Sequence, residues 1–525
     1  MKIILCLALS LSVTPVWADD LLNVLDSPGA TAETPNQGYK VRNLFPSATA
    51  EQNIFFSFFE AGEYEKALYQ WFSAFDRSST AKTDNGRAIF GLLLYKNGLK
   101  VFGLQELFSA DANGIAGTLK KAWAESAVAT DPTWKVSRVK WTSEFTAVFG
   151  PQVESIVRAS QVDAATPLAT LQGLADKAPD RSEEKAWLKW QVALAHSLKG
   201  ETAQGAKIIK ELLATKEKRV SNDQLNLTVG RLLYEKGFLD AAIEYYQKVG
   251  KNSSDWFEAR EEIAWAHLRK GEPQNALAVL QDLQPTAFAS QVGPEPIFLK
   301  SLAHLKVCDY PNVATTLKDF KTRFKPRAEA LKALIDAETS IPSDEFIAKV
   351  KKGEATLKDL GPLADRLPRG LHREEVLRKL VLFQAQLESE AQKADALYAR
   401  SLTGGTEKVG FNARFGEFKL DLAKKAQGAR GASLSRIRQL ATNEFEEITQ
   451  ILQRAHIVEA EMVQQIHLSK KVTENSLSKV DVKKGRAAVT GEVLSFPFDG
   501  EVWMDELSNY KVDVKKGCQA RKGAG

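Results

Sequence analysis

Apolar residues recur along most of the chain with spacings of three and four, which is the pattern of amphipathic helices. The clearest stretch, from Leu225 to Val249, predicts two such helices separated by a turn at Gly237. A second pair of helices follows, with its turn at Gly271, 34 residues further on. A pattern that returns at such an interval indicates a repeated pair of antiparallel helices.

Turns of the same kind recur elsewhere in the sequence. They are predicted at Gly62, Gly98 and Gly200, and a degenerate one at Cys308. Neighbouring turns are 34 to 37 residues apart, and the one long gap, from Gly98 to Gly200, is 102 residues, or three times 34. The gap therefore leaves room for two degenerate units.

Aligning these units on the turn residue shows a regular order of small and large side chains. Small residues prevail five positions after the turn and seven before it: Ala67, Gly103, Gly205, Ala242, Ala276 and Val313, and Phe55, Gly91, Ala193, Gly230, Ala264 and Ser301. Large residues stand nine positions after it: Trp71, Leu107, Ile209, Tyr246, Leu280 and Leu317. Small residues are needed where two helix backbones cross closely, and large ones are needed to fill the space between one helix pair and the next.

This order resembles the tetratricopeptide repeat, through Gly230 and Tyr234 in one helix, Gly237 in the turn, and Ala242 and Tyr246 in the next. The match is good at 223–283, fair at 48–110 and 186–222, and weak at 111–185 and after Cys308. The resemblance implies an all-α, right-handed α-solenoid with a concave inner surface. It also implies peptide or protein binding and no catalysis.

In a solenoid of this kind the first helix of each pair lines the concave surface, and this geometry gives the candidate partner-binding residues. They are Trp187, Trp190, Arg231, Tyr234, Glu235, Glu258, Glu261, Trp265 and Arg269. Aromatic and arginine side chains there would anchor an extended peptide or a partner helix. The alternative is that Trp187 and Trp265 fill gaps in the core and that the charges form pairs on the helix surface.

Beyond Cys308 the pattern is looser but still helical, with helices expected at 328–350, 371–400 and 411–427. Residues 433–470 predict one long helix. That helix could form a coiled-coil seam, but Glu459 interrupts the seam. Packing over the end of the solenoid is therefore the favoured interpretation.

After Lys479 the apolar period changes to two, which predicts a small β appendage. The heptapeptide KVDVKKG occurs at 479–485 and again at 511–517, and each copy suits an edge strand. The stretch 496–510 is similar to the tails of some exported repeat proteins of gliding or predatory bacteria, which are associated with envelope motility machinery. Its candidate partner-binding residues are Phe496, Phe498, Trp503 and Tyr510. The alternative is that these aromatic residues simply cover the last helix.

The first 18 residues have the pattern of a secretory signal peptide: Lys2, then an apolar run, then Pro15 and a small residue, Ala18, at the expected cleavage site. Pro-rich residues 19–49 predict a flexible lead-in. The expected organisation is then TPR-like repeats at 50–327, degenerate repeats at 328–432, a long helix at 433–478 and the β tail at 479–525. Cys308 and Cys518 could form one bridge, or two separate thiols.

Composition excludes a disordered chain, since 44% of the 525 residues are hydrophobic and 26% charged. The net charge is +5, and basic and acidic residues are interspersed, so no stripe for nucleic acid is predicted. The sequence has no phosphate loop, nucleophile elbow or HExxH motif, and no cofactor is expected. His196, His267 and His304 each stand four residues before a turn, which favours packing over metal binding.

These features predict a non-enzymatic periplasmic or secreted scaffold whose partners are proteins or peptides of a cell-envelope complex. Motility or adhesion machinery is a candidate process. No transmembrane segment is expected in the mature chain. Two alternatives remain open: a peptidoglycan-associated enzyme or its helper subunit, and a structural protein that self-assembles through residues 433–470.

Overall fold

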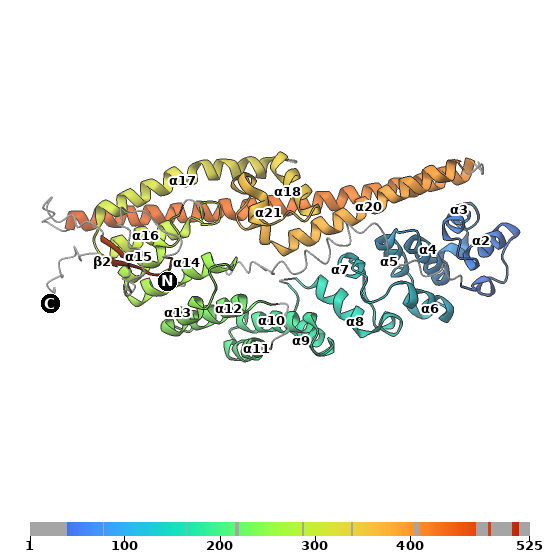
Figure 1. The fold of residues 1–525 in the computed structure, drawn as a ribbon, viewed down its shortest axis with the longest axis horizontal. Helices are drawn as coiled ribbons and strands as arrows, with labels where there is room; N and C mark the ends of the chain where they lie inside the picture. The colour runs from blue at the N-terminus through green and yellow to red at the C-terminus, as the bar shows by residue number, and fades with distance from the viewer. Residues whose placement is uncertain are drawn as a thin grey trace, which may run out of the picture.

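The computed structural model describes residues 39–76, 78–163, 165–215, 220–285, 288–337, 340–403, 409–468, 481–484 and 507–513. These residues are helical almost throughout, with two short strands near the C-terminus (Figure 1). The prediction of an all-α fold is confirmed for this part of the chain.

The helices over residues 50–177 are α2 (Ala50–Glu60), α3 (Tyr64–Ala74), α4 (Asp84–Lys96), α5 (Lys100–Leu107), α6 (Gly117–Ser126), α7 (Thr133–Val136), α8 (Ser143–Gln161) and α9 (Leu168–Lys177). The next pairs are α10 (Glu183–Leu198), α11 (Thr202–Ala214), α12 (Asn222–Glu235), α13 (Leu239–Gln247), α14 (Trp256–Lys270), α15 (Pro273–Gln281), α16 (Glu295–Lys306) and α17 (Tyr310–Asp336). The last helices are α18 (Ile341–Lys351), α19 (Leu357–Leu360), α20 (Glu375–Thr403) and α21 (Val409–Leu468). Short 3-10 turns are η1 (Arg42–Leu44), η2 (Ser79–Lys82), η3 (Ala112–Gly114), η5 (Gly361–Arg366) and η6 (Leu371–Arg373), and the strands are β1 (Asp481–Lys484) and β2 (Tyr510–Asp513).

The six predicted turn residues all adopt a left-handed backbone, with φ between 58° at Cys308 and 84° at Gly237. At each turn the next N–H donates back to a carbonyl of the preceding helix, as from Phe238 to Leu233 at 2.9 Å. This bond closes the first helix and fixes where the second begins. A seventh turn of the same geometry occurs at Gly353, where the sequence pattern predicts none.

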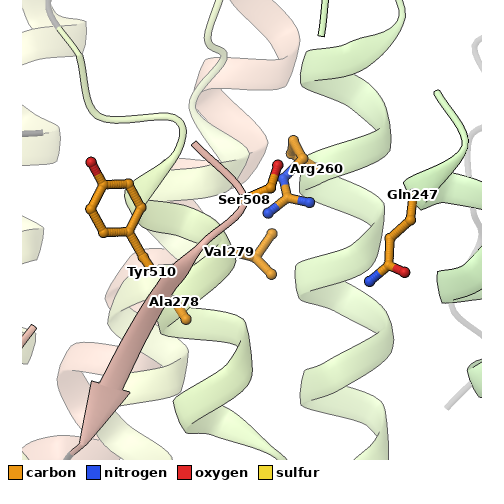
Figure 2. Close-up of a pocket in the computed structure, with 6 residues that line it drawn as sticks. All are labelled: Gln247, Arg260, Ala278, Val279, Ser508 and Tyr510. Carbon is orange, nitrogen blue, oxygen red and sulfur yellow. The ribbon is translucent and has the colours of Figure 1, made fainter. Parts of the chain in front are cut away.

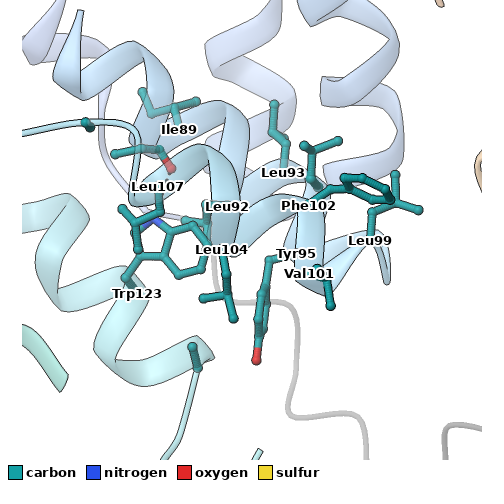
Figure 3. Packing of buried hydrophobic residues seen from close by; sticks show 14 of the residues in the cluster. Ile89, Leu92, Leu93, Tyr95, Leu99, Val101, Phe102, Leu104, Leu107 and Trp123 are labelled. Atoms are coloured by element: carbon teal, nitrogen blue, oxygen red, sulfur yellow. Dashed lines mark hydrogen bonds between the residues drawn. The ribbon is translucent and has the colours of Figure 1, made fainter. Parts of the chain in front are cut away.

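The small residues of the repeat lie where the paired helices cross. A Cβ added to Gly91 on α4 would lie 2.6 Å from the carbonyl oxygen of Gly103 on α5, and the reverse is equally true. Gly205 approaches Ala193 in the same way, at 2.8 Å. The large residues nine positions after the turns are all buried. Figure 3 shows the outcome around α4, where Leu92, Leu104 and Trp123 gather from three helices.

Helix α21 runs for 60 residues along one side of the helix pairs, beside α20 (Figure 1). Near its start, Phe415 stacks on Phe72 of α3 with ring centroids 4.8 Å apart. Further along, Ile448 and Ile451 join the core formed by α14 to α17. One helix therefore packs against pairs near both ends of the array, whereas the favoured interpretation placed the long helix over the end of the solenoid alone.

The long helix begins earlier than the sequence predicts. The helix expected at 411–427 and the one expected to start at 433 are one continuous element, so the boundary between 432 and 433 is wrong. Gly428 and Gly431 lie inside it, and each disfavours helix by about 1 kcal/mol. Packing of Leu434 and Ile437 into a neighbouring core overrides that preference. Helix α17 likewise continues to Asp336, past the boundary expected at 327.

The end of the expected lead-in is packed against the first helix pair. The N–H groups of Val41 and Arg42 both donate to Glu60 Oε1 at 3.0 Å. Val41 is buried, and Phe45 stacks on Phe56. Residues 39–49 are therefore part of the folded unit, which differs from the expectation of a flexible segment. Residues 1–38, with the expected signal peptide, lie outside the described residues.

The described parts of the two KVDVKKG copies pair with one another, whereas the sequence predicts a strand in each copy without saying what it pairs with. Strands β1 and β2 are antiparallel, with Val482 opposite Val512. Strand β2 lies along α15 (Figure 1), and Leu507 and Tyr510 are buried in the same core as that helix.

A buried carboxylate joins α20 to the start of α5. Glu390 on α20 is fully buried and accepts hydrogen bonds from the N–H of Val101 at 2.8 Å and of Phe102 at 3.2 Å. Gln386 donates to the same carboxylate. Glu390 thus caps the free N–H groups of a helix in a distant part of the chain. Burial raises the pKa of Glu390 to about 7, in spite of these bonds.

We expect replacement of Gly91 by alanine to lower the free energy of unfolding by about 1–3 kcal/mol, because the new methyl group must push α4 and α5 apart. Gly428→Ala is the matched control, since a Cβ there meets no atom within 4 Å. It should raise the stability by about 0.5–1 kcal/mol. Urea unfolding of both variants is the measurement, and equal effects would contradict the close crossing.

The raised pKa of Glu390 predicts a pH dependence of stability. Between the ordinary carboxyl value near 4.5 and about 7 the folded chain holds a proton that the unfolded chain has lost, so stability falls as pH rises through this window. Tyr95 and Lys393 also face this carboxylate, and Tyr95 stays protonated here. Urea unfolding at several pH values should show a shallower fall for Glu390→Gln than for the wild type. Exposed Glu446→Gln should leave the profile unchanged, and identical profiles for both variants would refute the assignment.

Candidate functional site

The sequence-predicted candidates on helices lie on α10, α12 and α14, the first helices of three successive pairs. Local sequence fixes where each begins and ends. Ser221 caps α12 and forms a capping box with Gln224, while Gly271 closes α14 in a left-handed turn. We call the side of α12, α14 and α16 that carries Arg231, Glu258, Glu261, Glu262 and Glu295 the inner face.

Trp187 and Trp190 on α10 lie in the hydrophobic core. Their exposed fractions are 1% and 5%, and both belong to the cluster formed by α9 to α12. Trp190 Nε1 lies 3.5 Å from Thr228 Oγ1 on the neighbouring pair. The two indoles offer a partner almost no surface, which corrects their assignment as accessible anchors and favours the alternative that they fill the core.

Arg231 is the centre of an ion-pair network on the inner face. Its guanidinium lies 2.6 Å from Glu262 and 3.2 Å from Glu258, both on α14. Burial raises the pKa of Glu262 although Arg231 opposes this. Burial would also raise the pKa of Glu258, but Arg373 and Arg231 hold it below its usual range.

Glu261 and Trp265 extend the inner face toward α16. Trp265 is half-buried, and its Nε1 donates to Glu295 Oε1 at 2.8 Å. Burial raises the pKa of Glu261 well above its usual range, and the negative charge of Glu295 raises it further. Two carboxyl groups so placed share a proton more readily than they both ionise.

Tyr234, Glu235 and Arg269 form the edge of the inner face near the turns. Arg269 lies over the Tyr234 ring, 5.1 Å from its centroid, and donates to the Tyr234 carbonyl at 2.9 Å. Glu235 and Arg269 are exposed and Tyr234 is partly so. Among the nine candidates, Glu235 and Arg269 are the two that are exposed.

The inner face has counterparts that sequence reasoning missed. Arg373 pairs with Glu258 at 2.5 Å, and Arg369 pairs with Glu447 of α21 at 2.7 Å. Glu444 of α21 binds both Arg327 and the backbone N–H of Arg369. No periodic pattern marks these residues, because they come from an irregular segment and from a helix far along the chain. The signal in the sequence that could have identified this segment is the high arginine content of residues 366–373.

In the tail, Phe496, Phe498 and Trp503 lie outside the described residues, and Tyr510 is buried at the start of β2. Tyr510 lines a cavity of about 370 Å³ with Gln247, Arg260, Ala278, Val279 and Ser508 (Figure 2). Arg260 pairs with buried Asp282, which also accepts from the N–H of Ser508 at 2.8 Å. Residues 507–513 of the tail are therefore packed against α13 to α15.

The histidines of the repeat bind acidic residues of their own turns. His196, His267 and His304 direct Nδ1 to Glu201, Glu272 and Asp309, at 2.6, 2.8 and 3.1 Å. Each acidic residue directly follows the turn residue, so the pair fixes the turn. Over the described ranges, no group of three or more His, Cys, Asp or Glu could hold a metal ion.

Three further findings concern the cysteines, membrane-spanning helices and known proteins. Cys308 is disulfide-bonded, and both other cysteines, Cys6 and Cys518, lie outside the described residues. None of the helices in the described part of the chain is long and apolar enough to cross a bilayer. No protein-family model and no curated protein matches this sequence.

The inner-face network predicts that Arg231→Met lowers the free energy of unfolding by about 1–3 kcal/mol, because it leaves Glu262 without its cation and Glu258 with Arg373 alone. Adding Glu262→Gln should recover part of the loss, which a double-mutant cycle measures. The control is exposed Arg454→Met on α21, expected to change stability by less than about 0.5 kcal/mol. Strictly additive effects of the two substitutions at 231 and 262 would show that the pair is not coupled.

Proposed function

We propose that this chain is a non-enzymatic scaffold that binds proteins or peptides through a tetratricopeptide-like solenoid. The observation that carries the proposal is the common phase of its turns. Six turns share one left-handed geometry, and small residues lie at the helix crossings in the same register. Such arrays stack successive pairs into extended surfaces, and their use is binding.

The accessible part of the candidate surface is its edge near the turns. Glu235 and Arg269 are exposed there, beside Phe238, which is 64% exposed. A surface that combines charged groups with a large exposed aromatic side chain suits a protein partner. In the interior of the inner face, arginines of the chain itself already pair with the carboxylates. A partner would therefore contact this edge first.

The cell envelope is the proposed location, and it rests on the sequence of residues 1–18. The proposed process, motility or adhesion, rests on the similarity of residues 496–510 to tails of exported repeat proteins. Of the tail, Leu507 and Tyr510 belong to the core that includes α13 to α15.

The test is crosslinking in living cells followed by mass spectrometry. The double variant Glu235→Lys with Arg269→Glu reverses both charges at the edge and should reduce capture of its partners about tenfold. The matched control is Glu244→Lys with Lys210→Glu, which reverses two exposed charges on second helices. Capture unchanged by the edge variant, or reduced equally by the control, would count against binding at this edge.

A further inference from the structure

Residues 365–373, which we call the strap, cross the inner face as a bound peptide would. The carbonyl oxygens of Asp365 and Leu367 each accept a hydrogen bond from Arg327 at 2.6 Å. The backbone N–H of Arg369 donates to Glu444 Oε2, also at 2.6 Å. Side chains of α17 and α21 thus form hydrogen bonds with both carbonyl oxygens and N–H groups of the strap backbone.

Two arginines of the strap, four residues apart, form ion pairs with different carboxylates. One nitrogen of Arg369 lies 2.7 and 3.0 Å from the two oxygens of Glu447 on α21. Arg373 reaches α14, where it pairs with Glu258 and donates to the Ser254 carbonyl. Gly293 makes room for Arg369, because a Cβ at that position would overlap the guanidinium. The planar guanidinium suits such sites better than an ammonium group does.

The inner face carries more carboxylates than the strap neutralises. Glu261 faces both Glu295 and Arg369. Together with Glu258, Glu262, Glu444 and Glu447, these two glutamates outnumber the arginines outside the strap that pair with them, Arg231 and Arg327, so the face without the strap is acidic. Charge complementarity therefore selects a basic segment and rejects an acidic one.

We propose that the inner face is a binding site for a turn-forming segment of a partner protein that carries two arginines four residues apart, as the strap does around Gly370. The strap is its resident occupant and mimics that segment. Buried Leu367 and Leu371 anchor the strap, so the site is closed in most molecules and a partner binds the fraction in which it is open. This inference rests on the proposed function and names its partner class.

The test uses a fluorescein-labelled peptide with the sequence of residues 365–373 and the full-length protein, followed by fluorescence anisotropy. Arg369→Gln with Arg373→Gln weakens the resident strap and should bind the peptide about tenfold more tightly than the wild type, because more molecules are open. Adding Glu258→Gln should remove most of this binding. The control Lys207→Gln with Lys210→Gln removes two exposed charges on α11 and should behave as the wild type.

A peptide that keeps Arg366 but has glutamine in place of Arg369 and Arg373 should not bind any of these proteins. If the folded Arg369→Gln, Arg373→Gln variant binds no better than the wild type, or binds the glutamine peptide equally, the site does not exist. If that variant fails to fold, hydrogen exchange on the wild type decides. A millimolar excess of the arginine peptide should then speed exchange of the Arg369 amide, and unchanged exchange overturns the proposal. These peptide-binding results do not depend on the crosslinking experiment in cells. The proposed scaffold function and the proposed arginine-segment site can therefore fail independently.

Discussion

The arrangement of the helix pairs depends on the packing of α21 across them. Pairs in a repeat array contact mainly their neighbours, so the array alone has no contact that fixes one end relative to the other. Helix α21 supplies it, since Phe415 belongs to the core of the first pairs and Ile451 to the core of the last. At 1.5 Å per residue its 60 residues span about 90 Å, enough to connect the two cores as a single rigid element.

Closing the array in this way brings charged residues out of water. Glu258 and Glu261 would be solvated on a free α14, but the strap and α21 lie against them. Desolvated carboxylates cost free energy unless cations or hydrogen bonds compensate. Arg231 and Arg373 provide part of that compensation, and burial raises the pKa of Glu261, which favours its uncharged form. The network is thus a consequence of closure, and its incomplete neutralisation follows from the excess of acidic groups.

Local features of the fold could be predicted from the sequence, because they depend on residues close together in the chain. A left-handed turn needs glycine or its equivalent, and Cys308 takes that role within the phase of the repeat. Gly91 and Gly103 marked a helix crossing for the same reason. The start of α21 could not be predicted, since Gly428 and Gly431 suggest a break and only contacts with distant helices outweigh them. The partners of the candidate site, Arg369 and Glu447, were equally hidden, because nothing periodic connects them to α14.

Equivalent positions of the repeat consequently have different roles. Trp187 and Glu258 both stand thirteen residues before a turn, and Trp190 and Glu261 both stand ten before it. On α10 these positions are core residues, and Lys379 of α20 lies over the Trp187 ring. On α14 they are carboxylates that meet the arginines of the strap. The repeat fixes where a side chain points, whereas the C-terminal segment opposite it decides whether that position packs or pairs. The binding properties of the inner face therefore belong to the repeats and the C-terminal helices together.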